Sequence, residues 1–191
     1  CPMARRRNGA IFSAFAVLVV ALLCAGVTAG VHHGLAGAFE QSDLALDEAK
    51  GGAQRKLLFP DATSFESQSA PAVEGLNSVY KADTGAWVFD VTSAQGYHGD
   101  VELMVGINAD GTVAGIQVVA EDETDGIGTN ALTEEYFGGF AGATAAGELT
   151  VDEAGAGQTH VDAVSGATFT SRAVVDCLNI AFAAYAQMGG N

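Results

Sequence analysis

The sequence is poor in cysteine and in basic residues, and each shortage excludes a class of protein. Its three cysteines among 191 residues are Cys1, Cys24 and Cys177, and they lack the paired spacing of a zinc site or a disulfide framework. We expect Cys177 to be a small buried apolar residue. Eight Lys and Arg stand against 23 Asp and Glu, a formal net charge of −15. Because nucleic-acid binding depends on Lys and Arg, nucleic acid is excluded as a partner.

The few basic residues are unevenly placed. Arg5, Arg6 and Arg7 precede all of the acidic residues, whereas residues 32–191 carry five basic and 23 acidic residues, a net charge of −18. Between these regions, residues 9–31 contain no charged residue, and a membrane-spanning helix needs about 20 apolar residues. Basic residues flanking such a helix favour the cytoplasmic side. We therefore expect residues 1–8 to lie in the cytoplasm and residues 9–31 to form a transmembrane helix that contacts the lipid of the cell membrane. The rest of the chain should then be extracytoplasmic.

The alternative for this apolar segment is a cleaved signal peptide. Residues 27–29, Val-Thr-Ala, resemble a cleavage site. The uncharged run is longer than the apolar core of about 7–15 residues that a signal peptide has, which favours a retained anchor.

The next elements alternate between helical and strand patterns. Residues 41–59 predict a helix that Pro60 ends, and we expect 32–65 to be a juxtamembrane helical stalk. Residues 64–75 are polar and indicate a loop. The remaining expected elements are strands at 86–97, 101–107 and 112–123, a turn at 108–111, a helix at 129–137 capped by Thr129 or Asn130, short strands within 148–155 and 159–164, and a helix at 171–188. This order indicates an α+β domain over 66–191 in which helices pack on an antiparallel sheet.

Residues 162–171, Asp-Ala-Val-Ser-Gly-Ala-Thr-Phe-Thr-Ser, place small and hydroxyl residues before the last expected helix. Gly166 permits a sharp turn there. Hydroxyls at a helix start commonly cap it, and a helix N-terminus also attracts phosphate. The hydroxyls in question belong to Ser165, Thr168, Thr170 and Ser171. The segment therefore suits either a cap or a phosphate that is bound or covalently attached.

The same string resembles the flavinylation motif Asp-x-x-Ser-Gly-Ala-Thr of the FMN-binding domain family. The match falls on Asp162, Ser165, Gly166, Ala167 and Thr168, and a hydroxyl pair follows at Thr170 and Ser171. The resemblance implies that one FMN is joined to Thr168 by a phosphoester bond. It also implies that an ApbE-type flavin transferase makes this bond from FAD and reads Asp162 and the small residues.

A second stretch, residues 96–128, resembles the G subunit of the Rnf complex. The family pattern Glu-Thr-Pro-Gly-Leu-Gly appears here as Glu123-Thr124-Asp125-Gly126-Ile127-Gly128, with Asp125 at the usual proline. Glu121 also stands where the family often has His. The resemblance adds Glu123, Thr124, Gly126 and Gly128 to the expected cofactor site. We expect no metal site, because the acidic residues 121–125 are interpreted as a solvated face.

The sequence allows two roles for each of two aromatic residues. Trp87 and Tyr97 either stack on the flavin or, as is commoner for aromatic residues in strands, belong to the core.

The resemblance implies a membrane-anchored flavoprotein subunit without independent catalysis. It would transfer electrons within an Rnf-type complex that couples ferredoxin:NAD oxidoreduction to Na⁺ or H⁺ translocation, with the other subunits as partners. Three alternatives stay open: the C subunit of the Na⁺-translocating NADH:quinone oxidoreductase, a freestanding extracytoplasmic flavinylated carrier, and an anchored binding module without cofactor.

Overall fold

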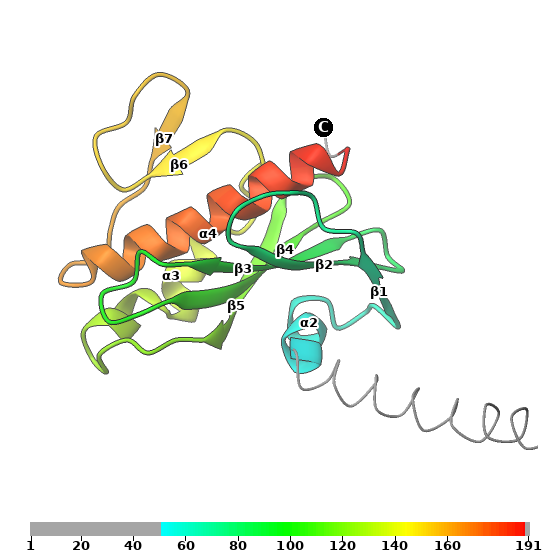
Figure 1. Cartoon of the computed structure of the whole chain (residues 1–191), viewed down its shortest axis with the longest axis horizontal. Coiled ribbons are helices and arrows are strands. Elements are labelled where there is room, and N and C mark those ends of the chain that lie inside the picture. The colour runs from blue at the N-terminus through cyan, green and yellow to red at the C-terminus, as the bar shows by residue number, and fades with distance from the viewer. Residues whose placement is uncertain (1–50, 190–191) are drawn as a thin grey trace, which may run out of the picture. The chain divides into compact units, whose positions relative to one another are not determined.

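A five-stranded antiparallel sheet organises residues 51–189, the part of the chain that this computed structural model describes (Figure 1). The strands lie in the order β1-β2-β3-β4-β5, and every neighbouring pair is antiparallel. Their bounds are β1 Phe65–Gln68, β2 Leu76–Ala82, β3 Trp87–Ser93, β4 Val101–Ile107 and β5 Val113–Ala120. The expected antiparallel sheet with packed helices is confirmed.

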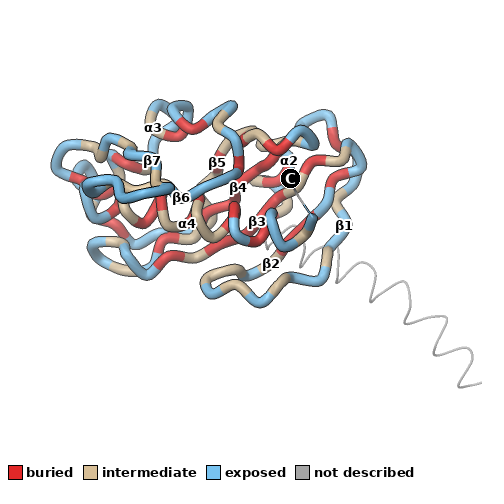
Figure 2. Tube along the Cα trace, turned by 90° about the horizontal axis from the view of Figure 1, so that it is seen from above, coloured by how far each residue is buried: buried red, intermediate tan, exposed pale blue. Residues whose placement is uncertain are grey.

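The main core lies between this sheet and α4, Thr168–Gln187, which crosses one face of it (Figure 1). Alternation along β3 and β4 directs Val91, Leu103 and Val105 towards this helix, which contributes Val174 and Leu178. All five side chains are fully buried. Figure 2 shows the resulting run of buried residues along β3, β4 and α4. Cys177 is also buried there, as expected, and burial raises its thiol pKa far above the ordinary range.

The opposite face of the sheet is partly covered by α2, Ala53–Leu58, which contacts β4 and β5. Arg55 of this helix is buried, and its guanidinium carbon lies 4.0 Å from the centre of the Tyr80 ring. The helix ends just before Pro60, as predicted, although most of the expected helix 41–59 lies outside the described residues. The domain boundary expected at residue 66 falls inside β1, and α2 already packs on the sheet.

The expected transmembrane helix at 9–31 lies outside the described residues. Within residues 51–189, no helix combines the length and the apolar character needed to cross a bilayer.

Two strands and one helix differ from the sequence prediction. β1 and β2 were missed because β1 is a short polar strand and β2 changes register between Leu76 and Ser78. The expected helix 129–137 is divided into a 3₁₀ turn η2, Gly128–Ala131, and α3, Glu134–Gly138. The cap of α3 is Thr133, whose hydroxyl accepts from the Tyr136 amide, so the prediction of Thr129 or Asn130 is wrong.

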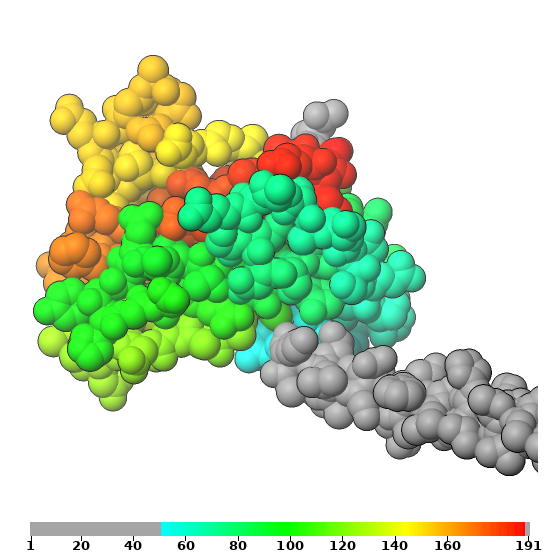
Figure 3. All heavy atoms as spheres, viewed as in Figure 1, coloured from blue at the N-terminus to red at the C-terminus, as the bar shows by residue number. Residues whose placement is uncertain are grey.

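The two expected short strands are present as β6, Glu148–Thr150, and β7, Gln158–His160, which pair in parallel. We call residues 148–160 the β6–β7 lobe; Figure 3 shows it in yellow beside the start of α4. The Asn179 side chain on α4 holds β6 through two hydrogen bonds with the backbone of Leu149, at 2.8 and 2.9 Å. The lobe is thereby fastened to the helix that begins at Thr168.

Candidate functional site

The small-residue motif at 162–171 forms the turn into α4. Thr168 is the first residue of the helix, and its side chain is exposed. Just before it, Gly166 has a φ of +82°, a conformation that residues with a side chain rarely adopt. The Ala167 amide closes this turn by donating to the Val164 carbonyl at 2.9 Å. The turn therefore presents the Thr168 hydroxyl to solvent at a helix N-terminus.

The neighbouring hydroxyls do not cap the helix, which corrects one of the two expectations from sequence. α4 begins at residue 168 rather than 171, so Thr170 and Ser171 lie within its first turn, and Ala167 at the cap position makes no side-chain capping bond. The buried Ser171 hydroxyl instead accepts from the Val164 amide and donates to the Ala167 carbonyl. It holds the turn that precedes Thr168.

Glu123 connects three segments of the site. Its side chain is buried, and one carboxylate oxygen accepts from the Thr170 hydroxyl at 2.6 Å. The other oxygen accepts from the backbone amide of His98 at 3.2 Å. The carboxylate thus joins the loop after β3, the loop after β5 and the first turn of α4.

Close packing around this carboxylate explains a glycine of the 121–128 loop. A Cβ atom on Gly128 would lie 2.2 Å from a carboxylate oxygen of Glu123, which no packing allows. The loop also folds on itself, because the Thr124 carbonyl accepts from the Gly128 amide at 2.9 Å.

A cavity of about 320 Å³ opens beside the Thr168 hydroxyl. Three of its lining residues have large apolar side chains that are unusually exposed, namely Tyr97 at 61%, Ile127 at 51% and Phe169 at 53%. The Tyr97 and Phe169 ring centres are 5.8 Å apart, with a 45° angle between the rings. The rest of the lining is Gly128, Gly166, Ala167, Thr168 and Thr170. Exposed apolar groups that gather around a hollow are typical of a binding site.

The structure thus brings together most of the expected site residues. Gly166, Ala167, Thr168 and Thr170 of the motif line the cavity together with Gly128. Glu123 and Ser171 do not line it, but they hydrogen-bond to the segments that do. Thr124 lies in the same loop as Gly126, which has a φ of +72°. Ser165 is exposed in the turn. Of the two aromatic candidates, Trp87 packs against the core beside Phe89, and only Tyr97 reaches the cavity.

Asp162 is the expected residue that the structure places elsewhere. It borders a larger hollow of about 670 Å³ between α3 and the β6–β7 lobe, whose lining does not include Thr168. Its side chain is fully exposed, and one carboxylate oxygen lies 3.5 Å from Nε2 of His160. An exposed carboxylate at the first position of the motif is accessible to another protein.

Sequence reasoning missed two cavity residues, Ile127 and Phe169. Both are large apolar residues within motifs whose other residues are small or polar, and this contrast could have identified them as candidate binding residues. Within the described residues there is also no group of His, Cys, Asp and Glu arranged to hold a metal ion.

Comparisons with known proteins place this site in a family. A family model described as the FMN-binding domain matches residues 96–183. The G subunit of the ion-translocating oxidoreductase complex of Pseudoalteromonas atlantica is 31% identical over 187 residues, covering 90% of this chain and 84% of that protein. The G subunit of the Na(+)-translocating ferredoxin:NAD(+) oxidoreductase complex of Acetobacterium woodii is 27% identical over 190 residues, covering 90% and 89%.

The region that contains the cavity and the motif is therefore an FMN-binding domain. The chain belongs to the family of G subunits of ion-translocating oxidoreductase complexes, known as Rnf complexes, and the resemblance seen in the sequence is confirmed. Among solved structures, the C subunit of the Na(+)-translocating NADH-quinone reductase of Parabacteroides distasonis has a TM-score of 0.47 and 22% identity, covering 59% of this chain and 61% of that chain.

The residues around the cavity fit FMN. A flat aromatic ring system suits a hollow bordered by Tyr97 and Phe169, and a phosphate suits the N-terminus of α4. Gly166 leaves open space at this turn, because no atom lies within 4 Å of the place where a Cβ would stand.

Proposed function

We propose that this chain is the subunit of an Rnf-type complex that carries one covalently attached FMN. The observation that carries the proposal is the exposed Thr168 hydroxyl, which stands at the N-terminus of α4 beside an apolar cavity. Its relatives are named as subunits of Na⁺- or proton-translocating ferredoxin:NAD⁺ oxidoreductase complexes. The chain would transfer electrons within such an ion-translocating complex, with the other subunits as partners.

The chain's residues place the cofactor, and bound FMN supplies the electron-transfer chemistry. Thr168 holds the phosphate, and the unpaired backbone N–H groups of the first helical turn favour its negative charge. Tyr97, Ile127 and Phe169 offer apolar surface to the ring system. Glu123 and Ser171 fix the segments that carry these groups.

Attachment requires a separate enzyme and a pyrophosphate donor. An ApbE-type transferase would bring FAD to the exposed hydroxyl. A bond forms between Oγ1 of Thr168 and the phosphorus on the FMN side of FAD, and the pyrophosphate bond breaks. AMP leaves with the bonding electron pair, and the hydroxyl proton is released to a base of the transferase or to water.

Mass spectrometry of the native complex tests this proposal. The peptide that contains Thr168 is expected to carry the mass of FMN less one water, with fragment ions that assign it to Thr168. A native peptide that is wholly unmodified would contradict the covalent assignment.

The exposed Asp162 gives a second test of attachment. We expect Asp162→Ala to abolish flavinylation although Thr168 is intact, because a fully exposed carboxylate outside the cavity serves recognition better than cofactor contact. In-gel flavin fluorescence of the full chain, produced with the transferase, measures the effect. Glu153→Ala is the matched control, because it removes an exposed carboxylate from the β6–β7 lobe. Full fluorescence in the Asp162 variant would refute the recognition role.

We further propose that residues 9–31 anchor the chain in the cell membrane, with 1–8 in the cytoplasm and 32–65 leading to an extracytoplasmic domain. Extracytoplasmic placement would suit covalent attachment, because a dissociated cofactor would be lost there.

Thiol labelling tests this topology. Ser67 is exposed on the edge strand β1, so a Ser67→Cys chain whose Cys1 and Cys24 are replaced by Ser should react in intact spheroplasts with a membrane-impermeant reagent. The parent chain retains the buried Cys177, whose raised pKa keeps it protonated, and it should stay unlabelled. If Ser67→Cys were labelled only after lysis, the domain would lie in the cytoplasm and the proposed topology would be wrong.

A further inference from the structure

Arg172 is the only Lys or Arg in α4, the helix that begins at Thr168. In the whole sequence it is the only Lys or Arg that follows Lys81. It lies four residues after Thr168 on α4, and side chains at this spacing are neighbours on one helix face. Helical side chains also lean back towards the N-terminus, and the Arg172 guanidinium carbon lies 5.7 Å from the centre of the Phe169 ring. The guanidinium thus lies beside Phe169, the residue that follows Thr168.

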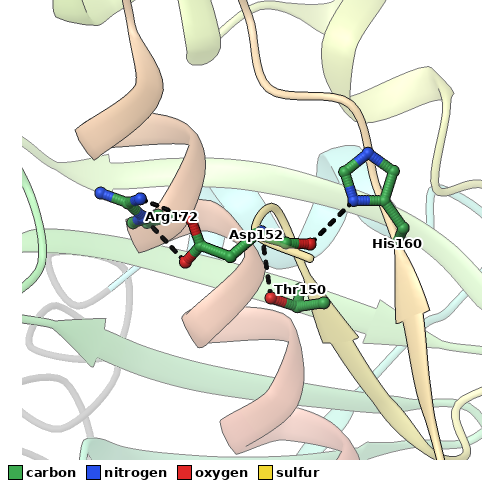
Figure 4. Close-up of polar contacts among 4 residues, drawn as sticks. All are labelled: Thr150, Asp152, His160 and Arg172. Carbon is green, nitrogen blue, oxygen red and sulfur yellow. Dashed lines mark hydrogen bonds and ion pairs between the residues drawn. The ribbon is translucent and has the colours of Figure 1, made fainter. Parts of the chain in front are cut away.

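In this structure the guanidinium is bound to the β6–β7 lobe. Its Nη2 and Nε donate to the two carboxylate oxygens of Asp152 at 2.5 and 3.3 Å (Figure 4). Arg172 lowers the pKa of Asp152, chiefly through these hydrogen bonds, so the pair is charged at neutral pH.

Asp152 in turn organises the segment between β6 and β7. Its carbonyl oxygen lies 3.0 Å from Nδ1 of His160, and its amide donates to the Thr150 hydroxyl at 3.1 Å (Figure 4). The ion pair therefore clamps this segment to α4, at a place separate from the Asn179 contact that holds Leu149. Both side chains of the pair are solvent-accessible, and exposed ion pairs stabilise weakly. Such a pair is readily exchanged for a better partner.

A phosphodiester on Thr168 would provide that partner. It adds a negative charge and strong acceptor oxygens one helical turn before Arg172, and guanidinium binds phosphate through two parallel hydrogen bonds. We propose that Arg172 leaves Asp152 for the phosphodiester when FMN is attached, so that flavinylation releases the β6–β7 lobe from its clamp. The inference rests on the proposed attachment at Thr168 and adds a change in the chain that attachment causes.

Hydrogen exchange on the full-length chain tests this change. The protein is produced with and without its flavin transferase, and intact mass first establishes whether FMN is attached. In the flavinylated form we expect amides of residues 151–160 to exchange about threefold faster, the order expected when an exposed ion pair is lost. The Leu149 amide is an internal reference, because its bond to Asn179 does not involve Arg172 and its exchange should not change.

Two variants determine whether Arg172 is the cause. In Arg172→Gln the clamp is absent from the start, so exchange at 151–160 should be fast in both forms and attachment should add nothing. In Asp152→Asn the lobe should likewise be fast in both forms, while the cation stays available to the phosphate. If the wild-type chain carries FMN but its amides at 151–160 exchange no faster than those of the unflavinylated chain, Arg172 does not change partner. The same conclusion follows if FMN attachment still accelerates hydrogen exchange in Arg172→Gln. Either result leaves the proposed function intact. A missing FMN mass on the wild-type chain overturns the proposed function and this inference together.

Discussion

Thr168→Val is expected to remove all covalent flavin and leave the domain folded. Valine matches threonine in shape and replaces only the hydroxyl, which is exposed at the first position of α4 and caps nothing. The free energy of unfolding of the flavin-free chain should therefore change by less than about 0.5 kcal/mol, the range of surface substitutions. Denaturing gel fluorescence measures the flavin, and chemical denaturation of the unflavinylated chains measures stability.

Neighbouring hydroxyls provide the controls for this substitution. Ser165→Ala removes another exposed hydroxyl of the same turn without touching the proposed attachment atom, so its flavin content measures what the transferase requires at Ser165. Thr168→Ser restores a hydroxyl at the attachment position and should recover part of the flavin. Covalent flavin that persists in Thr168→Val would show that another residue carries it.

The parts of the fold that followed from sequence are those with strong local signals. Strand β4 was predicted with its observed bounds because apolar residues run between a glycine-containing turn and the Asp110-Gly111 hairpin. α4 was predicted from its apolar spacing, but its start was placed three residues late, because the β-branched and aromatic residues at 168–170 favour extended structure locally. The tertiary hydrogen bond from the Thr170 hydroxyl to Glu123 and the local bond from the Ser171 hydroxyl to the Ala167 carbonyl stabilise this first helical turn.

The site shows a similar division. Gly166 and Thr168 were predictable because the motif is contiguous in sequence. The cavity could not be predicted from residues alone, because Tyr97, Ile127 and Phe169 come from three segments and meet only when the sheet and α4 pack together. The pairing of Asp152 with Arg172 likewise depends on the β6–β7 lobe folding back onto the helix.

Glu123 hydrogen-bonds across the three segments that line the cavity. Of the substitutions proposed here, its replacement should lower the free energy of unfolding most. Glu123→Ala leaves the buried Thr170 hydroxyl and the His98 amide without their acceptor. Hydrogen bonds to a charged group contribute about 1.5–3 kcal/mol each, so we expect a loss of about 3 kcal/mol in the free energy of unfolding. Because the loops at Tyr97 and Ile127 also lose their connection to α4, the fraction of chain flavinylated should fall.

Two further variants separate a specific connection from a loss of charge. Glu123→Gln keeps one acceptor oxygen for the His98 amide and an N–H for the Thr170 hydroxyl, so it should retain more than half of the stability that alanine loses. Asp125→Asn removes a charge from an exposed side chain of the same loop and should change stability by less than about 0.5 kcal/mol. Denaturant unfolding of the unflavinylated chains, with flavin fluorescence after production with the transferase, measures both effects. If Glu123→Ala proved as stable and as fully flavinylated as Asp125→Asn, the carboxylate would not be what holds Tyr97, Ile127 and Thr168 around one cavity.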